Sequence, residues 1–463
     1  MTDKIQLISP VDGRVYAERE VADAAQVEQA LTAAASAQAA WQRRSLSERA
    51  ALCSAAVDAM LSMQADIVPE LAWQMGRPVR YGASELRGFA ERARHMIAIA
   101  PQALAALECD PVAGFRRYIK REPMGTVLVV APWNYPYLTA VNTIIPALMA
   151  GNSVILKHAS QTLLVGERFA EAMRRAKLPE GLFQNLLLDH VSTGAIIASG
   201  RVQQVNFTGS VDAGKAMESA ATGRFIGVGL ELGGKDPAYV RADANLEHAV
   251  ENLVDGSFFN SGQSCCAVER IYVDQKIFPV FVERFAELTR QYVLGNPLDE
   301  ATTLGPLVSP GAADFVRGQI ADAQALGAKA LIDPHAFAAD VAGSAYLAPQ
   351  VLVDVNHQMS VMRDESFGPV VGIMPVDSDE QAIALMNDSE FGLSASIWTR
   401  DLAAAERLGD EIDTGTLFMN RCDYLDPALA WTGVKNSGRG VTLSSMGYEH
   451  LTRAKSFHLR HET

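Results

Sequence analysis

The chain has 463 residues, with 40 Lys and Arg against 54 Asp and Glu, a formal net charge of -14 and 49% hydrophobic residues. Its 35 Gly and 20 Pro are ordinary usage, which excludes collagen-like and low-complexity chains and leaves a globular protein with a large core. The negative charge opposes a phosphate backbone, so we expect no nucleic-acid partner.

The N-terminus and the cysteines narrow the class further. Residues 1–10 lack the apolar core of a signal peptide, and the most apolar stretch, residues 126–156, is interrupted by Asn and Pro. We therefore expect a soluble, cytoplasmic protein without a membrane partner. Five cysteines are too few for a disulfide framework in a chain of this length. Because their number is odd, at least one thiol is free. No Cys and His grouping has metal-ligand spacing, so we expect no metal site.

The first hundred residues have a helical pattern. Apolar side chains recur every three to four residues from about residue 21 to residue 107, and Ser45 with Glu48 forms a capping box before one of these helices. Residues 113–125 then hold a basic, strand-like run that must pair with another strand to satisfy its backbone. This run is a candidate for an oligomer-forming ribbon.

The middle of the chain alternates short apolar runs with helical segments, which is typical of a parallel sheet with ligands at the carboxyl ends of its strands. The expected strands are residues 126–131, 153–157, 183–188 and 202–208. This is a nucleotide-binding architecture. A second α/β run begins near Gly233 and indicates a separate domain. Its expected strands are 270–274, 370–376 and 415–420, and its expected helices are 278–293 and 309–328.

Two turns that follow expected strands are candidates for ligand contacts. Gly209 and Gly214 flank a helix start near Ser210, where free amides and the helix dipole favour an anion, although ordinary helix capping explains the same turn. Asn134 lies between two prolines after the strand 126–131. Its side-chain amide can donate to a developing oxyanion, or it can only form an Asx-turn.

Two cysteines and one carboxylate are candidates for catalysis. Cys265 and Cys266 follow a Gly-Gln-Ser loop; a buried cysteine is usually a small hydrophobe, whereas a catalytic thiol is partly exposed with its thiolate favoured. Glu231 ends an apolar run before Gly233 and Gly234, where burial can raise the carboxyl pKa enough to make a base near neutral pH. A surface Glu that caps a loop is the alternative reading.

Taken together these motifs resemble the aldehyde dehydrogenase superfamily over nearly the whole chain. The spacing agrees as well as the identities, because 23 residues separate Asn134 from Lys157 and 34 separate Glu231 from Cys265. The residues that carry the resemblance are Pro132-Trp133-Asn134-Tyr135-Pro136, Lys157, Phe207-Thr208-Gly209-Ser210 through Gly214, Glu231-Leu232-Gly233-Gly234-Lys235, Gly262-Gln263-Ser264-Cys265, Glu365-Ser366-Phe367-Gly368-Pro369, and Gly433-x-Lys435-x-Ser437-Gly438.

The resemblance implies three catalytic roles. Cys265 is the nucleophile, with Cys266 its non-catalytic neighbour, and the Asn134 side chain and the Cys265 amide hold the oxyanion of the thiohemiacetal. After hydride leaves for a nicotinamide, Glu231 activates the water that hydrolyses the thioester to the carboxylic acid. A CoA-acylating relative has no need of Glu231, and a non-catalytic relative has no need of any of the three residues, so we expect the hydrolytic enzyme.

The same resemblance implies a site for NAD or NADP. The implied cofactor residues are Trp133, Lys157, Ser160, Gly209, Ser210, Gly214, Leu232, Glu365 and Phe367. After Lys157 the family commonly has Pro, and three residues after it often has a Glu that repels a 2'-phosphate, whereas this chain has His158 and Ser160. Like charges about 4 Å apart repel by about 1 to 4 kcal/mol, so Ser160 predicts that NADP is accepted.

The loop before the last glycine motif departs from the family because Trp431 replaces the usual Phe. With Tyr135, Tyr137 and Tyr424 it predicts an aromatic entrance suited to apolar or aromatic aldehydes. An inward Arg421 would instead bind the carboxylate of a semialdehyde, although an exposed position is expected for an Arg.

The resemblance also implies the fold class and the domains. We expect an α/β protein with a Rossmann-like parallel-sheet cofactor domain at 1–107 and 124–232 and an α/β catalytic domain at 233–436. A small β oligomerisation ribbon at 108–123 and 450–463 would build a homodimer or homotetramer and leave no bare sheet edge.

Overall fold

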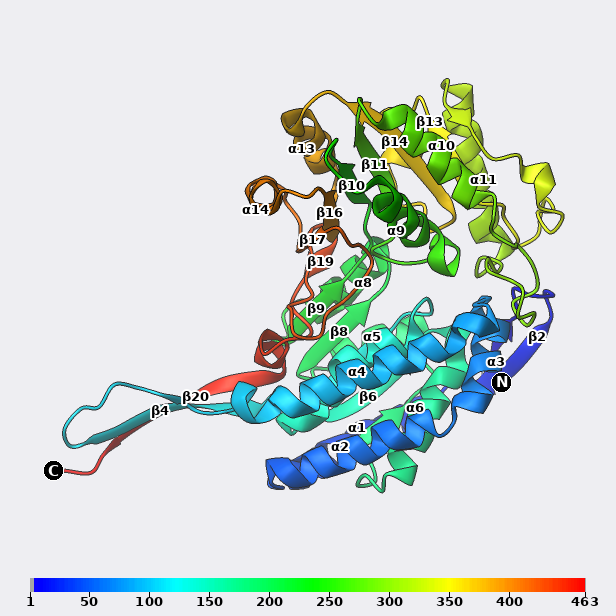
Figure 1. Cartoon of the computed structure of the whole chain (residues 1–463). Coiled ribbons are helices and arrows are strands. Elements are labelled where there is room, and N and C mark those ends of the chain that lie inside the picture. Colours follow the sequence, from blue (N-terminus) through cyan, green and yellow to red (C-terminus); the bar gives the residue numbers. More distant parts are fainter. Residues whose placement is uncertain (1–3, 463) are drawn as a thin grey trace.

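The structure is a computed structural model and describes residues 4–462. Two sheets, each built mainly of parallel strands, organise the two halves of the molecule, and a long two-stranded arm with the C-terminus near its tip reaches out to one side (Figure 1). The expected α/β class is confirmed.

Eight helices and a six-stranded sheet make up most of the first half. The helices are α1 (Ala24–Trp41), α2 (Leu46–Leu61), α3 (Gln64–Met75), α4 (Val79–Ala103), α5 (Pro136–Ala150), α6 (Leu163–Arg175), α7 (His190–Ala198) and α8 (Val211–Ala221). The sheet strands are β5 (Thr126–Ala131), β6 (Ser153–His158), β7 (Phe183–Asn185), β8 (Gln204–Thr208), β9 (Gly227–Glu231) and β19 (Gly438–Arg439), in the order β19-β9-β8-β5-β6-β7.

The helical pattern expected for the first hundred residues is confirmed by α1 to α4. The capping box at the start of α2 is formed as well, because Ser45 Oγ accepts from the Glu48 amide and Glu48 Oε2 accepts from the Ser45 amide. Every residue of β5 and β6 is buried, which explains why these strands are continuous apolar runs rather than alternating ones.

The parallel strands β5, β6, β8 and β9 end at one edge of this sheet. That edge therefore collects the segments that follow them, which include Asn134 after β5, Gly209 after β8, and Lys157 and Glu231 at the ends of β6 and β9. The topology thus places residues that are far apart in sequence on one side of the molecule.

The second half contains a seven-stranded sheet with the order β12-β13-β14-β11-β10-β16-β17, and two separate hydrophobic clusters cover its faces. The strands are β10 (Asp236–Val240), β11 (Val268–Asp274), β12 (Lys329–Ala330), β13 (Gln350–Val353), β14 (Val370–Val376), β16 (Ser394–Trp398) and β17 (Thr416–Met419). The helices are α9 (Leu246–Phe258), α10 (Phe278–Thr289), α11 (Pro310–Ala325), α12 (Ser360–Arg363), α13 (Asp379–Asn387) and α14 (Leu402–Gly409).

The expected strands of this half are present, but the helix expected over 278–293 ends at Thr289 because the chain turns after it. β10, β13, β16 and the helices α9, α13 and α14 had no sequence-based expectation. The three strands and the helices α13 and α14 are short, and two of the strands carry a Pro or a Gln that weakens the strand pattern.

The projecting arm is formed by β4 (Phe115–Pro123) and β20 (Thr452–Arg460), which pair antiparallel along their whole length, while the short β3 (Leu107–Glu108) covers part of the other side of β4. Tyr118 and Phe457 stack across the pair with ring centroids 4.6 Å apart. The basic run of residues 113–125 therefore finds its partner in a strand more than 300 residues away.

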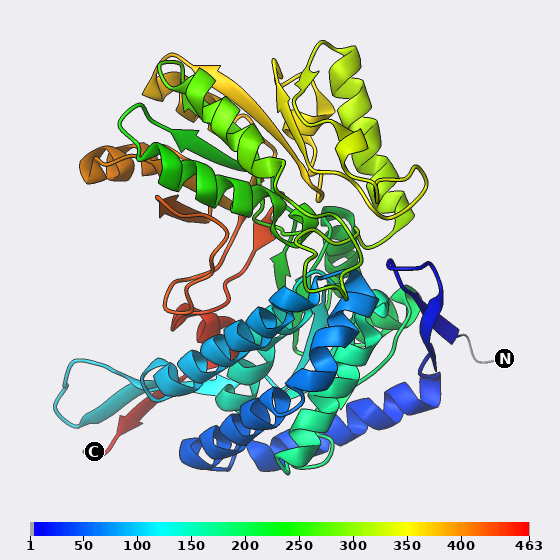
Figure 2. The same ribbon diagram turned by 45° about the vertical axis from the view of Figure 1, so that its right-hand side comes forward.

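A hairpin at the N-terminus, β1 (Lys4–Ile8) and β2 (Val15–Glu20), links the two halves. Figure 2 shows it beside the second half, where the Tyr346 hydroxyl donates to the Val11 carbonyl at 3.2 Å. Two short strands, β15 (Phe391–Gly392) and β18 (Val434–Lys435), form a further pair. In residues 4–462 no single helix has the length and hydropathy of a membrane span; α2 and α3, bent by 67°, pass that test only when joined.

Candidate active site

A buried guanidinium fixes the loop that carries Asn134. Arg77, between α3 and α4, forms an ion pair with Glu85, donates from Nη2 to the Asn134 carbonyl at 2.7 Å and lies over the Tyr135 ring at 4.6 Å. Its Nε donates to Asn260 Oδ1 at 3.2 Å. One side chain therefore joins the loop after β5 to the segment that precedes Cys265.

Glu85 completes this arrangement at the start of α5. Its Oε1 accepts from the backbone amides of Tyr137 at 2.9 Å and Leu138 at 3.1 Å, so a buried carboxylate takes up the free amides at the positive end of the helix. Sequence reasoning missed both Arg77 and Glu85, because charged residues in helical segments are normally exposed to solvent.

The segment before the nucleophile has unusual backbone geometry. Asn260, Ser261 and Gly262 lie consecutively in the left-handed region, with φ of 54°, 58° and 71°. Non-glycine residues hold this conformation only when their surroundings fix it. Here Asn260 Nδ2 donates to the carbonyls of Asn134 and Gln263, each at 3.2 Å, and Ser261 Oγ donates to the Gly305 carbonyl at 2.8 Å.

Asn134 and the loop of Cys265 are in direct contact. Asn134 is 5% exposed, and its Nδ2 donates to the Gln263 carbonyl at 3.3 Å, two residues before Cys265. Cys265 is partly exposed, whereas Cys266 is buried. The Asn134 amide and the Cys265 loop are therefore held together, as a nucleophile and an oxyanion donor require.

The Cys266 thiol belongs to a polar group with Ser264 and Asp423 that lines the same cavity as Cys265. It donates to Asp423 Oδ1 at 2.9 Å, and Ser264 Oγ donates to the same oxygen at 2.9 Å. Burial raises the pKa of Asp423 to about 6. A hydrogen bond with Cys265, together with burial, raises the pKa of the Cys266 thiol well above its usual value. Cys266 is therefore held as a neutral thiol.

Two adjacent glycines bring the segment after β9 against the rest of the site. A Cβ on Gly233 would lie 2.4 Å from Glu365 Oε2, and a Cβ on Gly234 would lie 2.3 Å from the Cys265 carbonyl oxygen. Only residues without a side chain allow these approaches. The glycines therefore place the chain after Glu231 directly beside both Glu365 and Cys265.

Glu231 itself is held by two hydroxyls. Its Oε2 accepts from Thr208 Oγ1 at 2.9 Å, and its Oε1 accepts from Thr442 Oγ1 at 2.5 Å. Burial raises the pKa of Glu231, and these hydrogen bonds act in the opposite direction. The side chain lines a cavity of only about 10 Å³, separate from the one that Cys265 lines.

A buried ion pair positions the loop of Glu365. Lys235 pairs with Glu269, and Glu269 also accepts from the amides of Ser366 at 2.8 Å and Phe367 at 2.9 Å. Glu365 Oε1 accepts from the Gly234 amide at 2.9 Å, and burial with the nearby Glu269 charge raises the pKa of Glu365 to about 7. Sequence reasoning missed Glu269, which lies inside β11.

Trp133 and Phe367 meet at this point. Their ring centroids are 5.6 Å apart in an edge-to-face arrangement, and Phe367 has a φ of 51°. The structure thus joins two motifs more than 230 residues apart in sequence into one aromatic wall.

The remaining expected cofactor residues lie along the first sheet. Lys157, at the end of β6, is 7% exposed and has no hydrogen bond or ion pair within residues 4–462, and burial lowers its pKa. Ser160 is half-buried in the next turn. His158 is buried with Nε2 3.2 Å from the Pro136 carbonyl and Nδ1 3.0 Å from Thr162 Oγ1, and burial lowers its pKa to about 4.

The turn after β8 has the expected form. Ser210 caps α8 by accepting from the Ala213 amide at 3.4 Å, and the helix begins at Val211. A Cβ on Gly214 would lie 2.6 Å from Leu232 Cδ2, so the glycine lets α8 pack closely on the buried Leu232 side chain. A Cβ on Gly209 would likewise collide with the Phe207 ring.

A cavity of about 420 Å³ leads to Cys265. Tyr135 and Tyr424 line it, in agreement with the aromatic entrance expected from the sequence, but the other two aromatic residues expected there do not. Tyr137 and Trp431 are 0% and 4% exposed and belong to the core of the first half. Tyr137 faces inward because it stands on the first turn of α5, where it packs against Phe169.

Arg421 is exposed and lies over the Tyr424 ring at 3.3 Å, so its side chain covers the ring from outside. It does not line the cavity of Cys265.

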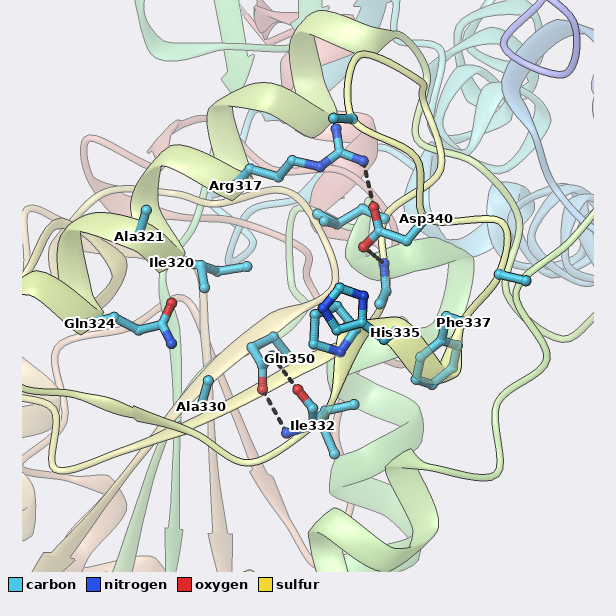
Figure 3. A pocket seen from close by; sticks show the side chains of 15 residues that line it. Arg317, Ile320, Ala321, Gln324, Ala330, Ile332, His335, Phe337, Asp340 and Gln350 are labelled. Carbon is cyan, nitrogen blue, oxygen red and sulfur yellow. Dashed lines mark hydrogen bonds and ion pairs between the residues drawn. The ribbon is translucent and has the colours of Figure 1, made fainter.

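A second cavity, of about 680 Å³, lies between α11 and the strands β12 and β13 (Figure 3). Its polar groups are satisfied by one another: Arg317 Nη2 donates to Asp340 Oδ1 at 2.8 Å, and Gln350 exchanges two hydrogen bonds with the Ile332 backbone. None of its lining residues belongs to the segments that surround Cys265, so we assign it no part in the chemistry.

Comparison with known proteins agrees with this geometry. The model of the aldehyde dehydrogenase family matches residues 1–457. Betaine aldehyde dehydrogenase 1 of Rhizobium meliloti (strain 1021) is 34% identical over 98% of this chain and 93% of its own. Succinate-semialdehyde dehydrogenase [NADP(+)] of Mycobacterium avium (strain 104) is 34% identical over 88% of this chain and 86% of its own.

A solved structure is also similar over the whole chain. Betaine aldehyde dehydrogenase from Staphylococcus aureus in complex with NAD+ superposes with a TM-score of 0.93, at 26% identity over 100% of this chain and 92% of that one. The chain belongs to the aldehyde dehydrogenase family. It is therefore an aldehyde dehydrogenase, and the resemblance stated from its motifs is confirmed.

The Arg77 contacts predict a large loss when its charge is removed. In Arg77→Met, Glu85 stays buried without a counter-ion, which costs about 3–5 kcal/mol of folding free energy, and the Asn134 carbonyl loses one of its two donors. We expect a clearly lower urea midpoint and reduced turnover. Arg80→Met, an exposed position nearby, is the control; equal midpoints for both variants would contradict the role of Arg77.

Proposed function

We propose that this enzyme oxidises an aldehyde to the carboxylic acid through a covalent intermediate on Cys265. The observation that carries the proposal is the convergence of three segments: Asn134 donates to the Gln263 carbonyl, and Gly234 lies directly against the Cys265 carbonyl. Both contacts surround the one thiol of the Cys265-Cys266 pair that is partly exposed, at the cavity of about 420 Å³.

The first step is addition of the Cys265 thiolate to the aldehyde carbon. The carbonyl oxygen becomes an oxyanion, which accepts one hydrogen bond from Asn134 Nδ2 and one from the backbone amide of Cys265. Because Asn134 is fixed through Arg77 and Asn260, its amide is already oriented when the charge develops. Cys266 takes no part, because its thiol stays protonated and donates a hydrogen bond to Asp423.

A bound NAD or NADP would supply the hydride acceptor that this oxidation requires. The residues present fit such a group. Lys157 is a buried ammonium without a partner in the described chain, suited to ribose hydroxyls or phosphate, and the amides at the start of α8 favour a pyrophosphate. Glu365 keeps one carboxylate oxygen free for a ribose hydroxyl, and Trp133, Phe367 and Leu232 offer apolar surface.

Glu231 acts as the base that hydrolyses the resulting thioester. Burial raises its pKa, which makes the carboxylate a better acceptor for a proton from water. In the structure the carboxylate is bound to Thr208 and Thr442, so it must leave these hydroxyls to reach a water molecule beside Cys265. A CoA-acylating enzyme would release its acyl group to a thiol instead, and product analysis with and without CoA separates the two reactions.

We also propose that the chain forms a homodimer or homotetramer and acts in the cytoplasm. β20 is an exposed edge strand of nine residues, and β3 covers only two residues of β4. Long exposed edges are normally covered in native proteins. Light scattering should therefore give at least twice the mass of the 49.8 kDa chain, and a monomer at all concentrations would contradict this assignment.

Replacement of the nucleophile should abolish oxidation. Cys265→Ser removes the thiolate, so we expect a fall in kcat of at least about 10³-fold, in line with the loss of a nucleophile in other enzymes. Cys266→Ser keeps a hydrogen bond to Asp423 and should retain most of the activity. Equal activity of Cys265→Ser and the wild type, measured by reduced-cofactor absorbance, would overturn the assignment.

Removal of the base should separate the two half-reactions. In Glu231→Gln we expect a burst of reduced cofactor followed by slow turnover, because the thioester forms but is not hydrolysed. In the wild type the steady-state rate should fall as pH drops through the raised pKa of Glu231, since only the ionised form is a base. A Glu231→Gln variant with an unchanged steady-state rate would exclude the role.

Ser160 should permit NADP. We expect Ser160→Glu to lower the ratio of kcat/KM for NADP to kcat/KM for NAD by at least about 5-fold, the effect of about 1 kcal/mol of charge repulsion. The relative named for NADP(+) and the neighbour with bound NAD+ support acceptance of either cofactor. A wild-type enzyme that strongly prefers NAD would show that Ser160 is not decisive.

A further inference from the structure

Arg92 is a buried charge in the wall of the cavity that leads to Cys265. It stands on α4, is 8% exposed and lines that cavity together with Cys265. Its Nη1 donates to the Leu138 carbonyl at 2.9 Å and to Asn142 Oδ1 at 3.4 Å. In residues 4–462 no carboxylate lies within ion-pair distance of it, and its Nε and Nη2 have no hydrogen-bond partner.

Three of the four carboxylates that line the cavity have hydrogen-bond or ion-pair partners of their own. Glu85 is paired with Arg77, Asp423 accepts from Cys266 and Ser264, and the exposed Glu91 accepts from the Tyr424 hydroxyl at 3.2 Å. The fourth carboxylate, Asp255, belongs to an exposed residue, although partial burial of the carboxyl group raises its pKa. Among the cationic side chains that line this cavity in the described chain, Arg92 is the one that is buried without an ion-pair partner, because Arg77 is paired with Glu85 and Arg87 is exposed.

Burial of a guanidinium without a counter-ion is costly, and such groups are normally paired. Burial lowers the pKa of Arg92, while the charges of Glu85, Cys266, Glu231 and Cys265 act in the opposite direction. Arg92 is therefore within electrostatic reach of the nucleophile without touching it. A ligand that spans from Cys265 to Arg92 and carries a negative charge at its far end would supply the missing partner.

We propose that Arg92 binds the terminal carboxylate of the substrate, which makes this enzyme specific for aldehydes that carry a carboxylate at the other end of a short chain. This inference rests on the proposed function, since it places the aldehyde carbon at Cys265. A guanidinium with free Nε and Nη2 edges matches the two oxygens of a carboxylate. Arg92 is thus a specificity-determining residue, in place of the exposed Arg421.

The test compares aldehydes that differ only in the charge at the far end. Succinate semialdehyde, butanal and 4-aminobutanal share a four-carbon chain, and the five- and six-carbon semialdehydes cover a longer span. We expect the wild type to have its highest kcat/KM with one of the semialdehydes. In Arg92→Gln the ratio of kcat/KM for that semialdehyde to kcat/KM for butanal should fall about 10²-fold, mainly through KM, as expected for loss of a buried charge partner.

Two further variants control for structure. Arg87→Gln removes an exposed Arg from the same helix and the same cavity wall, and the ratio should change less than about 3-fold because exposed charges are screened. Arg92→Lys should recover part of the ratio. Alkylation of Cys265 by iodoacetamide, followed against pH, reports whether the thiol is unaltered in each variant.

Three results would overturn the proposal. The wild type could prefer butanal or 4-aminobutanal, which would identify a neutral or cationic substrate class. Arg92→Gln could slow all three four-carbon aldehydes equally, or it could shift the pH dependence of Cys265 alkylation, and either result would make Arg92 a partner of the thiolate instead. Turnover of none of these aldehydes, with no acyl group on Cys265, would count against the proposed function rather than against Arg92.

Discussion

The site depends on the Arg77 guanidinium more than on any other single group. It joins the start of α5 through Glu85, the Asn134 loop through a backbone carbonyl, and the nucleophile loop through Asn260. Each of these segments is irregular or begins a helix, and each would leave polar groups unsatisfied on its own. A planar group with five donors in fixed directions can satisfy all three together. The geometry proposed for oxyanion binding follows from this clamp.

Two buried ion pairs and two unpaired buried cations bear on the site. Arg77 with Glu85, and Lys235 with Glu269, are paired within the protein and fix loops of the site. Lys157 and Arg92 are buried without such a partner in the described chain. Arg77 and Glu85 line the cavity of Cys265 together with Arg92, whereas Lys157 lies next to the last residue of β6 in the first sheet. The unpaired charges are therefore the places where bound anions are to be expected.

The sequence allowed much of the fold to be predicted because its strands and helices follow simple patterns. Continuous apolar runs identified β5 and β6, and the capping box identified the start of α2. Asn134, Glu231 and Cys265 were found because each lies at or close to the end of a strand and within a motif of the family. Their roles in the chemistry stay predictions until activity is measured.

Other parts could not be predicted because they depend on contacts between distant segments. Glu85 and Arg92 lie on a helix, and Glu269 lies in a strand, where nothing in the local pattern separates a buried charge from an exposed one. Tyr137 and Trp431 were expected at the cavity but face the core, because the direction of a side chain depends on how its helix or loop packs. The partner strand of β4 lies at the other end of the chain.

The central claim is that one sulfur atom carries the acyl group between oxidation and hydrolysis. The most direct measurement is rapid quenching of the enzyme with oxidised cofactor and excess aldehyde, followed by mass spectrometry of the peptide that contains residues 265 and 266. The account predicts an added acyl mass on Cys265 and none on Cys266. Continued turnover without an acyl group on Cys265 would contradict it.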